Sequence, residues 1–511
     1  MRTSIRPLHH VAWLAVVATL ITLTTAGCAV GPDFKAQAPA SPPSFADWHG
    51  GSPALVPPPA RADAAAPAGW AMFGDPVLDA LEARALAANA DLQTAALHFL
   101  QSRAQRSAVA SQAVPQLNAS AGVTRLRQSE NGETRRLLDA FNPPNQEQLI
   151  QVLSEPHDFY QAGFDASWEL DLWGRVRRSV ESADANVGAS QALLAQARLS
   201  VQAEVARRYF ELRAAQRQIA IARDDIAAAE ETLELVKARA DGGLTTDLDV
   251  MRQNAQAADL RARLPPLLAQ EAQAINQITL LLGERPGALQ SQLAARPGAA
   301  PAAALPDLSL GLPSDMALRR PDIQVAQAQL HAATANIGVA VADLYPRITI
   351  GAGFGLQSVD GSTFTDWGSR QWSIGPSLQL PIFDGGRRRA TVTLRELQQQ
   401  EAAVAYQQTV LKAWHEIDDA LSAYSAERLR NIQLAERERS SRDALQLARV
   451  RYDHGLTDFL VQLDAQRTWL QAQREYTEST SRLALGLVAV SKALGGAGDL
   501  PAKAAAAPSA G

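Results

Sequence analysis

Two long runs without proline, 175–240 and 387–454, constrain the fold of this chain more than any other feature. In the first run, large apolar residues recur at every seventh position and small residues form a second seam, which is a coiled-coil pattern. These residues are Val205, Leu212, Ile219, Ile226 and Leu233, with Ala215, Ala222, Ala229 and Val236. At 1.5 Å per residue, each run predicts a helix about 100 Å long. Because 47% of the residues are hydrophobic but only 5% are aromatic, packed helices are expected and a large compact α/β core is not.

Each long run ends at a glycine, and a shorter helical pattern begins at once, over 245–282 and 457–494. The two reversals share six residues with the same spacing. Leu235, Asp241, Gly243, Leu244, Thr245 and Leu248 recur as Leu447, Asp453, Gly455, Leu456, Thr457 and Leu460. Gly243 and Gly455 are most simply helix C-caps, because such a cap needs a positive φ. The chain is therefore predicted to make one sharp helix reversal twice.

The duplication extends over most of the chain. Asp91-Leu92-Gln93 recurs as Asp322-Ile323-Gln324, and Pro115 recurs as Pro346. Each half reads as helix, strand, loop, strand, very long helix, reversal and helix, and such a repeat suggests a symmetric, extended structure. The first repeat is predicted to span 76–300 and the second 301–495. The first half carries extra residues in its loop, between 115 and 170.

Four stretches alternate between apolar and polar residues, at 117–124, 160–172, 347–357 and 372–382. In the first of them, Leu117, Ala119, Ala121 and Val123 alternate with Asn118, Ser120, Gly122 and Thr124. A period of two over roughly ten residues is the signature of a transmembrane β-strand. Two hairpins that cover a soluble core would give a similar pattern, but the Gly-rich polar faces favour membrane strands.

Four strands cannot close a barrel, and lipid does not tolerate an open sheet edge. Known barrels need about eight strands or more. Several copies of the chain must therefore contribute strands to one barrel. Two copies would supply eight strands and three copies twelve, so the strand count requires an oligomer without choosing its size.

The N-terminus carries an export signal. Arg2 and Arg6 precede an apolar run from Val11 to about Thr25, which predicts a signal peptide over 1–27. The residues Leu23 to Cys28 resemble a bacterial lipobox, although Thr25 stands where Leu is usual. The resemblance implies that Cys28 becomes the first residue and is acylated, and that Ala29 after it favours sorting to the outer membrane. Ordinary signal cleavage that leaves a free thiol is the alternative.

Two flanking segments have biased compositions. Nine prolines lie between Pro32 and Pro67, so residues 28–75 are expected to form an extended tether that leads away from a lipid anchor. The tail, 496–511, is rich in Ala, Gly and Pro and is expected to be disordered.

The composition and the motifs argue against several classes of function. The net charge is −5 with interspersed signs, so there is no basic field for nucleic acid. A single cysteine excludes an internal disulfide and a cysteine-based metal cluster. The chain has no HExxH spacing, no Gly-x-Ser-x-Gly elbow and no phosphate loop. Asp418 and Asp419 are interpreted as a solvated helix face. No catalytic residue, metal site or cofactor is therefore expected, other than the lipid on Cys28.

Several motifs, in order along the chain, resemble one family. Cys28 to Phe34 looks like the mature start of outer-membrane efflux lipoproteins, and Trp70, Phe73, Asp75, Pro76 and Leu78 fit its next signature. Residues 168–175 (WELDLWGR), 319–323 (RRPDI) and 375–386 (GPSLQLPIFDGG) are further matches. From Cys28 to Leu494 the chain resembles the TolC/OprM outer-membrane factor family, in its NodT-type efflux lipoprotein branch.

This resemblance implies a fold and a set of partners. Three copies would form a twelve-strand β-barrel in the outer membrane, continued by long coiled-coil helices as a periplasmic α-barrel. A periplasmic adaptor (membrane fusion) protein and an inner-membrane pump would dock at the helical tip. The implied function is a passive, gated channel that carries drugs or other small solutes out of the periplasm. A channel for protein export and a lipid-anchored coiled-coil scaffold without a pore remain alternatives, and an enzyme comes last.

The resemblance also implies a periplasmic gate after the second reversal. Leu460, Asp464 and Arg467 match ring-forming residues of efflux relatives, and Tyr452 and Asp249 match a link between adjacent tips. Three copies of Asp464 around one axis would form a negative ring. From spacing alone, Asp464 and Arg467 are an ordinary i, i+3 surface pair. Asp464 corresponds to Arg252 in the first half, so the acidic ring is expected from the second reversal alone.

The residues around the two glycines are the candidates for contact with the adaptor. They are Gly243, Leu244, Thr245, Gly455, Leu456 and Thr457. A plain helix reversal would use similar residues, so the sequence alone does not separate the two interpretations.

Overall fold

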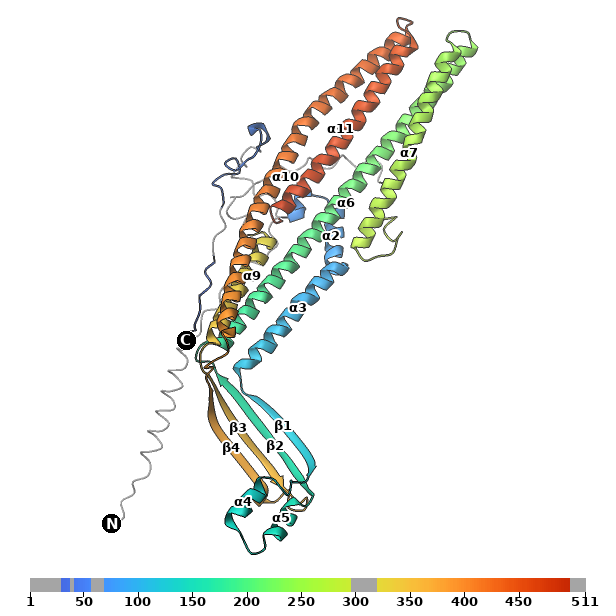
Figure 1. Ribbon diagram of the computed structural model, residues 1–511. Coiled ribbons are helices and arrows are strands. Elements are labelled where there is room, and N and C mark those ends of the chain that lie inside the picture. Colours follow the sequence, from blue (N-terminus) through green and yellow to red (C-terminus); the bar gives the residue numbers. More distant parts are fainter. Residues whose placement is uncertain (1–28, 37–40, 57–68, 296–318, 497–511) are drawn as a thin grey trace, which may run out of the picture. The chain divides into compact units, whose positions relative to one another are not determined.

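The computed structural model describes residues 29–36, 41–56, 69–295 and 319–496 (Figure 1). The predicted signal peptide, Cys28 and the tail beyond residue 496 lie outside the described residues. The first half contains α2 (Pro76–Ala88), α3 (Ala90–Ala110), β1 (Gln116–Leu126), α4 (Glu133–Phe141), α5 (Gln146–Ser154), β2 (His157–Leu170), α6 (Arg175–Asp241) and α7 (Asp247–Leu281). The second contains α9 (Pro321–Ala342), β3 (Arg347–Ser358), β4 (Arg370–Gln379), α10 (Arg387–Asp453) and α11 (Phe459–Ala493). Short 3-10 turns lie at Pro53–Leu55, Gly69–Phe73, Ser111–Ala113 and Trp367–Ser369.

The four predicted strands and the four predicted helices around the reversals are confirmed. The long helices α6 and α10 begin at the predicted residues, Arg175 and Arg387, and end within one residue of the predicted ends. The sequence missed α4 and α5, which occupy the longer loop of the first half. Each of them spans nine residues, too few for periodicity to distinguish a helix from a polar loop.

The strands form one antiparallel sheet in the order β1-β2-β3-β4. The pair β2–β3 joins the two halves of the chain, with Phe164 opposite Phe354. Next to this pair, a Cβ on Gly163 would lie 2.8 Å from the Phe354 carbonyl oxygen, so only glycine lets the strands approach this closely. Within the described residues, the outer edges of β1 and β4 have no partner strand.

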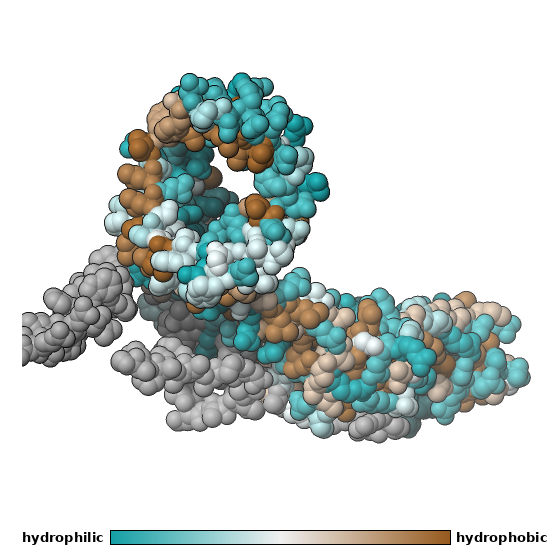
Figure 2. Space-filling view, turned by 90° about the horizontal axis from the view of Figure 1, so that it is seen from below, coloured by the Kyte–Doolittle hydropathy of each residue, from teal (hydrophilic) through white to brown (hydrophobic). Residues whose placement is uncertain are grey.

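The chain divides into two compact units that do not coincide with the two repeats. Among the described residues, unit 1 holds 29–35, 101–187 and 329–402, and unit 2 holds the remainder. Unit 1 therefore contains the whole sheet, and unit 2 contains both helix reversals. Seen from the end at which α4 and α5 lie, the surface combines apolar and hydrophilic patches (Figure 2).

The predicted coiled-coil seam forms the helical core of unit 2. Val205, Leu212 and Val236 are fully buried on α6. In one cluster, Ala229 of α6 packs with Ala257 and Leu260 of α7 and with Leu470 of α11. Alanine at the seam allows close approach of the helices, and each buried leucine contributes about 2 kcal/mol. No helix in the described ranges is both long enough and apolar enough to cross a bilayer.

The interpretation of Asp418 as part of a solvated face is wrong. Its carboxylate lies 2.7 Å from His49 Nδ1 and accepts a hydrogen bond from the Gly50 backbone N–H at 3.1 Å. Trp48 of the same Pro-rich segment packs edge-on against Trp414 of α10, with ring centroids 5.6 Å apart. The sequence could not show this contact, because its partners are more than 360 residues apart.

Candidate gate and docking tip

The two reversals have the same backbone structure. After α6, Gly243 has a φ of 69°, its N–H donates to the Ala240 carbonyl at 2.9 Å, and the Leu244 N–H donates to the Arg239 carbonyl at 2.8 Å. After α10, Gly455 has a φ of 68° and the same pair of bonds, at 2.9 and 2.8 Å. This is a Schellman cap. A Cβ at either glycine would meet nothing within 4 Å, so positive φ is the reason for glycine here.

The helices that follow the two caps begin differently. Asp249 accepts hydrogen bonds from the Thr245 and Thr246 hydroxyls, at 2.8 and 2.9 Å, and lies 3.7 Å from Arg252. Burial opposes ionisation of Asp249, but these hydrogen bonds outweigh it and hold the pKa of its carboxyl below the ordinary value. At the second reversal, Asp458 caps α11 by accepting from the Val461 N–H at 3.1 Å. The first tip is therefore a closed capping box, whereas the second has a single cap.

The tip residues divide into exposed and anchoring groups. Leu244 and Leu456 are 81% and 69% exposed. Thr245 and Thr457 are half-buried, and Thr245 is held by Asp249. The leucines are therefore the exposed apolar side chains of the two caps.

The three predicted gate residues lie on the first turns of α11. Leu460 and Asp464 are exposed. Arg467 donates from Nε to the Gln256 side-chain oxygen of α7, at 2.7 Å. In the described part of the chain, Arg467 and Asp464 form no ion pair, so the ordinary i, i+3 surface pair is not present. Arg467 instead ties α11 to α7, and the Asp464 carboxylate faces solvent.

The predicted link residues are not brought together within the described chain. Tyr452 packs against Phe459, with ring centroids 5.6 Å apart, and the Arg239 guanidinium lies 4.7 Å from its ring. Asp249 makes its contacts within its own cap. A single chain therefore does not contain a Tyr452–Asp249 link.

Sequence reasoning predicted Val236 in the helix seam but missed most of the other residues that support the tip. Val236, Phe459 and Leu463 form a small core, against which Val250 and Tyr452 pack. Arg239 contacts the Tyr452 ring and lies 3.9 Å from Asp453. The duplication contained a signal for Arg239, because Arg451 is its counterpart in the second half and both carbonyls accept the cap bond. For Gln256, the duplication contained no such signal.

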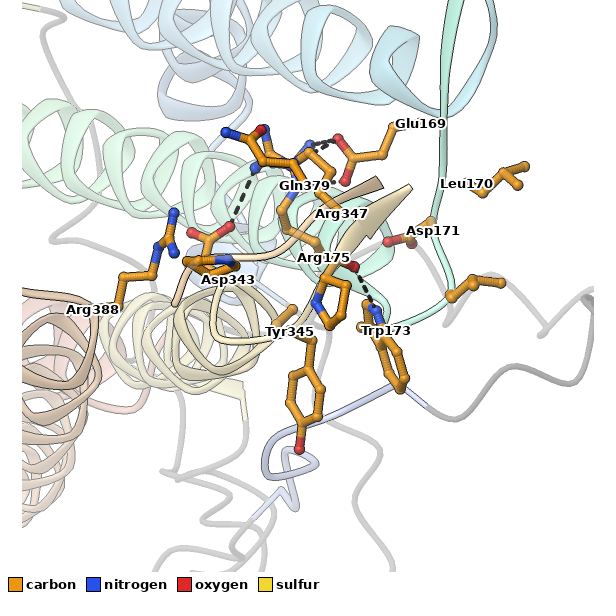
Figure 3. Close-up of a pocket in the computed structure, with 14 residues that line it drawn as sticks. Glu169, Leu170, Asp171, Trp173, Arg175, Asp343, Tyr345, Arg347, Gln379 and Arg388 are labelled. Atoms are coloured by element: carbon orange, nitrogen blue, oxygen red, sulfur yellow. Dashed lines mark hydrogen bonds and ion pairs between the residues drawn. The ribbon is translucent and has the colours of Figure 1, made fainter. Parts of the chain in front are cut away.

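The WELDLWGR motif lies in unit 1 and does not take part in the reversals. It lines a cavity of about 190 Å³ at the ends of β2, β3 and β4 (Figure 3). Glu169 forms two 2.8 Å hydrogen bonds with Arg175 and lies 3.6 Å from Arg347. The Trp173 ring N–H donates to the Pro346 carbonyl at 2.8 Å. These contacts fasten the strand ends to the start of α6, so the motif has a structural role.

Comparison with known proteins agrees with this arrangement. A model of the outer membrane efflux protein family matches residues 81–284 and 312–496. The chain is 35% identical over 487 residues to outer membrane protein OprJ of Pseudomonas aeruginosa, covering 95% of this chain and 96% of OprJ. It is 32% identical over 433 residues to the probable outer membrane lipoprotein SilC of Salmonella typhimurium, covering 84% and 88%.

Solved structures show the same fold. The outer-membrane channel OprN matches with a TM-score of 0.80 and 33% identity, covering 92% of this chain and 99% of OprN. The open-state MtrE channel of Neisseria gonorrhoeae matches with a TM-score of 0.74 and 28% identity, covering 92% and 98%. Three copies of the four-stranded sheet close a twelve-strand barrel in the outer membrane, which satisfies the edges of β1 and β4. The chain belongs to the outer membrane efflux protein family and is the outer-membrane channel component of an efflux pump.

Proposed function

We propose that this channel is the outer part of a tripartite pump and that Asp464, Leu460 and Arg467 form its periplasmic gate. One observation supports the proposed gate. The Asp464 carboxylate is exposed one turn from Leu460, while the Arg467 guanidinium is hydrogen-bonded to the Gln256 side chain. Threefold repetition around the channel axis makes a ring of carboxylates, which attracts cations and repels anions. Leu460 adds an apolar constriction beside this ring.

The exposed leucines support docking of a periplasmic adaptor protein, which connects the channel to an inner-membrane pump. Leu244 and Leu456 protrude from hydrogen-bonded caps whose geometry is the same at both reversals. Three copies present six such leucines. A partner that covers them removes apolar surface from water, at about 25 cal/mol per Å².

The N-terminal lipid supports the same location. Cys28 lies outside the described residues, and the family resemblance implies that it is acylated. SilC, which is 32% identical, is named as a probable lipoprotein. We propose a covalent lipid on Cys28, and Cys28→Ser is expected to change the mature N-terminal mass. An N-terminal peptide of equal mass in both proteins would refute the acylation.

The names of related proteins support a class of cargo for this channel. Relatives at 32% and 30% identity are named for toluene and solvent efflux, and another at 32% is named for pyoverdine export. We propose small organic solutes as the cargo of this channel.

Substitution of the tip leucines tests the docking proposal. Leu244→Asp with Leu456→Asp is expected to abolish efflux in cells, while purified trimers stay intact, because only the contact with the adaptor is lost. The matched control is Leu447→Asp, an equally exposed leucine on α10 away from the cap. Wild-type efflux in the tip variant would refute docking at the caps.

A further inference from the structure

The connection between β1 and β2 is a folded helical hairpin. Helix α4 is capped by Asn142, which has a φ of 41° and whose N–H donates to the Leu138 carbonyl at 2.8 Å. Arg135 of α4 pairs with Glu147 of α5 at 3.3 Å, and Ile150 of α5 is buried. The hairpin therefore has a defined structure and presents defined faces.

This hairpin exposes an apolar surface. On α4, Leu137 and Phe141 are 59% and 77% exposed and lie one turn apart on one face. On α5, the exposed apolar residues have i, i+3, i+4 spacing, and they are Leu149, Val152 and Leu153. Apolar patches are visible among hydrophilic surface at this end (Figure 2). An exposed apolar stripe on each of two adjacent helices indicates an interaction site.

The sheet register identifies what lies next to the hairpin in the trimer. The barrel closes only if β1 of one copy pairs with β4 of the next copy. Within one copy, Leu126 pairs with His157, Tyr160 with Ser358, and Leu356 with Arg370. The end of β1 and the start of β4 therefore lie at the same end of the sheet. The α4–α5 hairpin of one copy, which connects β1 with β2, is thus adjacent to the β3–β4 connection, 359–369, of the neighbouring copy.

That connection complements the hairpin. Trp367 is 76% exposed, and the guanidinium of Arg370 lies 4.0 Å from its ring centroid. Val359 is also exposed. Asp366, next to Trp367, is exposed, as is Arg136 on α4. The two surfaces therefore both expose apolar residues, and Asp366 and Arg136 supply one pair of opposite charges.

We propose that the α4–α5 hairpin of each copy packs on the 359–369 connection of the neighbouring copy, so that three such contacts form a collar around the outer mouth of the barrel. The contact continues the β1–β4 pairing between copies beyond the end of the strands. The contact is heterologous, because it joins the hairpin of one copy to a loop of the next copy. Contacts between copies around a threefold axis are of this kind. Only the first half carries the hairpin, so each boundary between copies holds one.

Cysteine cross-linking tests the collar. Phe141→Cys combined with Trp367→Cys, treated in membranes with a short bis-maleimide, is expected to give covalent dimers and trimers as the main species on denaturing gels. Single-cysteine variants control for reaction through Cys28, the one native cysteine. The matched control pair is Gln151→Cys with Trp367→Cys, because Gln151 lies on α5 away from the apolar residues.

Two outcomes of the cross-linking experiment decide whether the collar exists. Cross-linking of the Phe141 pair well above the Gln151 pair supports the collar. Only monomers or links within one chain, from trimers that native gels show to be intact, would overturn it. Leu137→Cys with Val359→Cys repeats the test if the first pair lowers the yield of trimers. Efflux activity is not the readout, so the outcome is independent of the gate and of adaptor docking.

Discussion

Gly243 and Gly455 are the residues whose chemistry decides where the chain turns. Both have a positive φ and an open space around the position of a Cβ. The sequence alone predicted their role, because a glycine at the end of a long helical pattern is typical of a helix C-cap. Their neighbours were harder to interpret: Thr245 and Leu244 are adjacent in sequence, yet one is held in a cap and the other protrudes.

Replacing either cap glycine by alanine should destabilise the tip. An L-residue in the left-handed region costs about 1–2 kcal/mol, so Gly455→Ala should lower the temperature at which helical circular dichroism is lost. Gly242→Ala is the matched control, because Gly242 is adjacent to the first cap and has no positive φ. Equal effects of Gly455→Ala and Gly242→Ala would contradict the assignment of the cap.

His49 should make the attachment of the Pro-rich segment depend on pH. Its two ring nitrogens lie 2.7 Å from Asp418 Oδ1 and 3.0 Å from the Ser52 carbonyl oxygen. Because both partners are acceptors, the ring donates to both only as an imidazolium. The hydrogen bond with Asp418, followed by that with Ser52, raises the pKa of His49 above its ordinary 6.5. The stabilisation is therefore complete below the unfolded pKa and is lost as pH rises through the folded pKa.

Chymotrypsin cleavage after Trp48 measures this attachment. Trp48 packs on Trp414, so cleavage should increase between pH 6 and pH 9 as the segment detaches. His49→Gln keeps one donor but does not titrate in this range, so its cleavage reports the pH dependence of the protease alone. The same profile for both proteins would rule out titration of His49 as the cause.

The elements follow from the sequence to different degrees. Alternation and heptads predicted the strands and the long helices, since each pattern is sustained over many residues. Helices α4 and α5 were missed, because nine residues are too few for a helical period to be recognised. The pairing of β2 with β3 joins the two repeats, and no local pattern encodes it.

The β2–β3 contact should tolerate no side chain at Gly163. A Cβ there would lie 2.8 Å from the Phe354 oxygen and 2.9 Å from Gly355 Cα, so the strands would have to separate. Gly163→Ala should therefore reduce the heat resistance of the trimer on gels. Gly351→Ala, on the inner strand β3 with a Cβ no closer than 4.0 Å to the Gly375 oxygen, should behave as wild type. If both variants lost heat resistance equally, close strand approach would not be the cause.

The whole molecule combines two repeats into two functional units. Each unit takes the same elements from both halves, so the sheet and the tip are each built from two versions of one design. The second reversal alone carries Asp464, and the first alone carries the closed cap around Asp249. The sequence predicted that the acidic residue belongs to one reversal only. It did not predict that Arg467 is held by Gln256, because that contact depends on how α11 packs against α7.

The conductance of purified trimers in planar bilayers tests the gate most directly. Asp464→Ala combined with Arg467→Ala removes the proposed carboxylate ring and the tie between α11 and α7, so conductance should rise several-fold and cation selectivity should fall. Asp443→Ala, an exposed carboxylate on α10, is the matched control and should leave both unchanged. A double variant with the conductance and selectivity of wild type would contradict a gate at the second reversal.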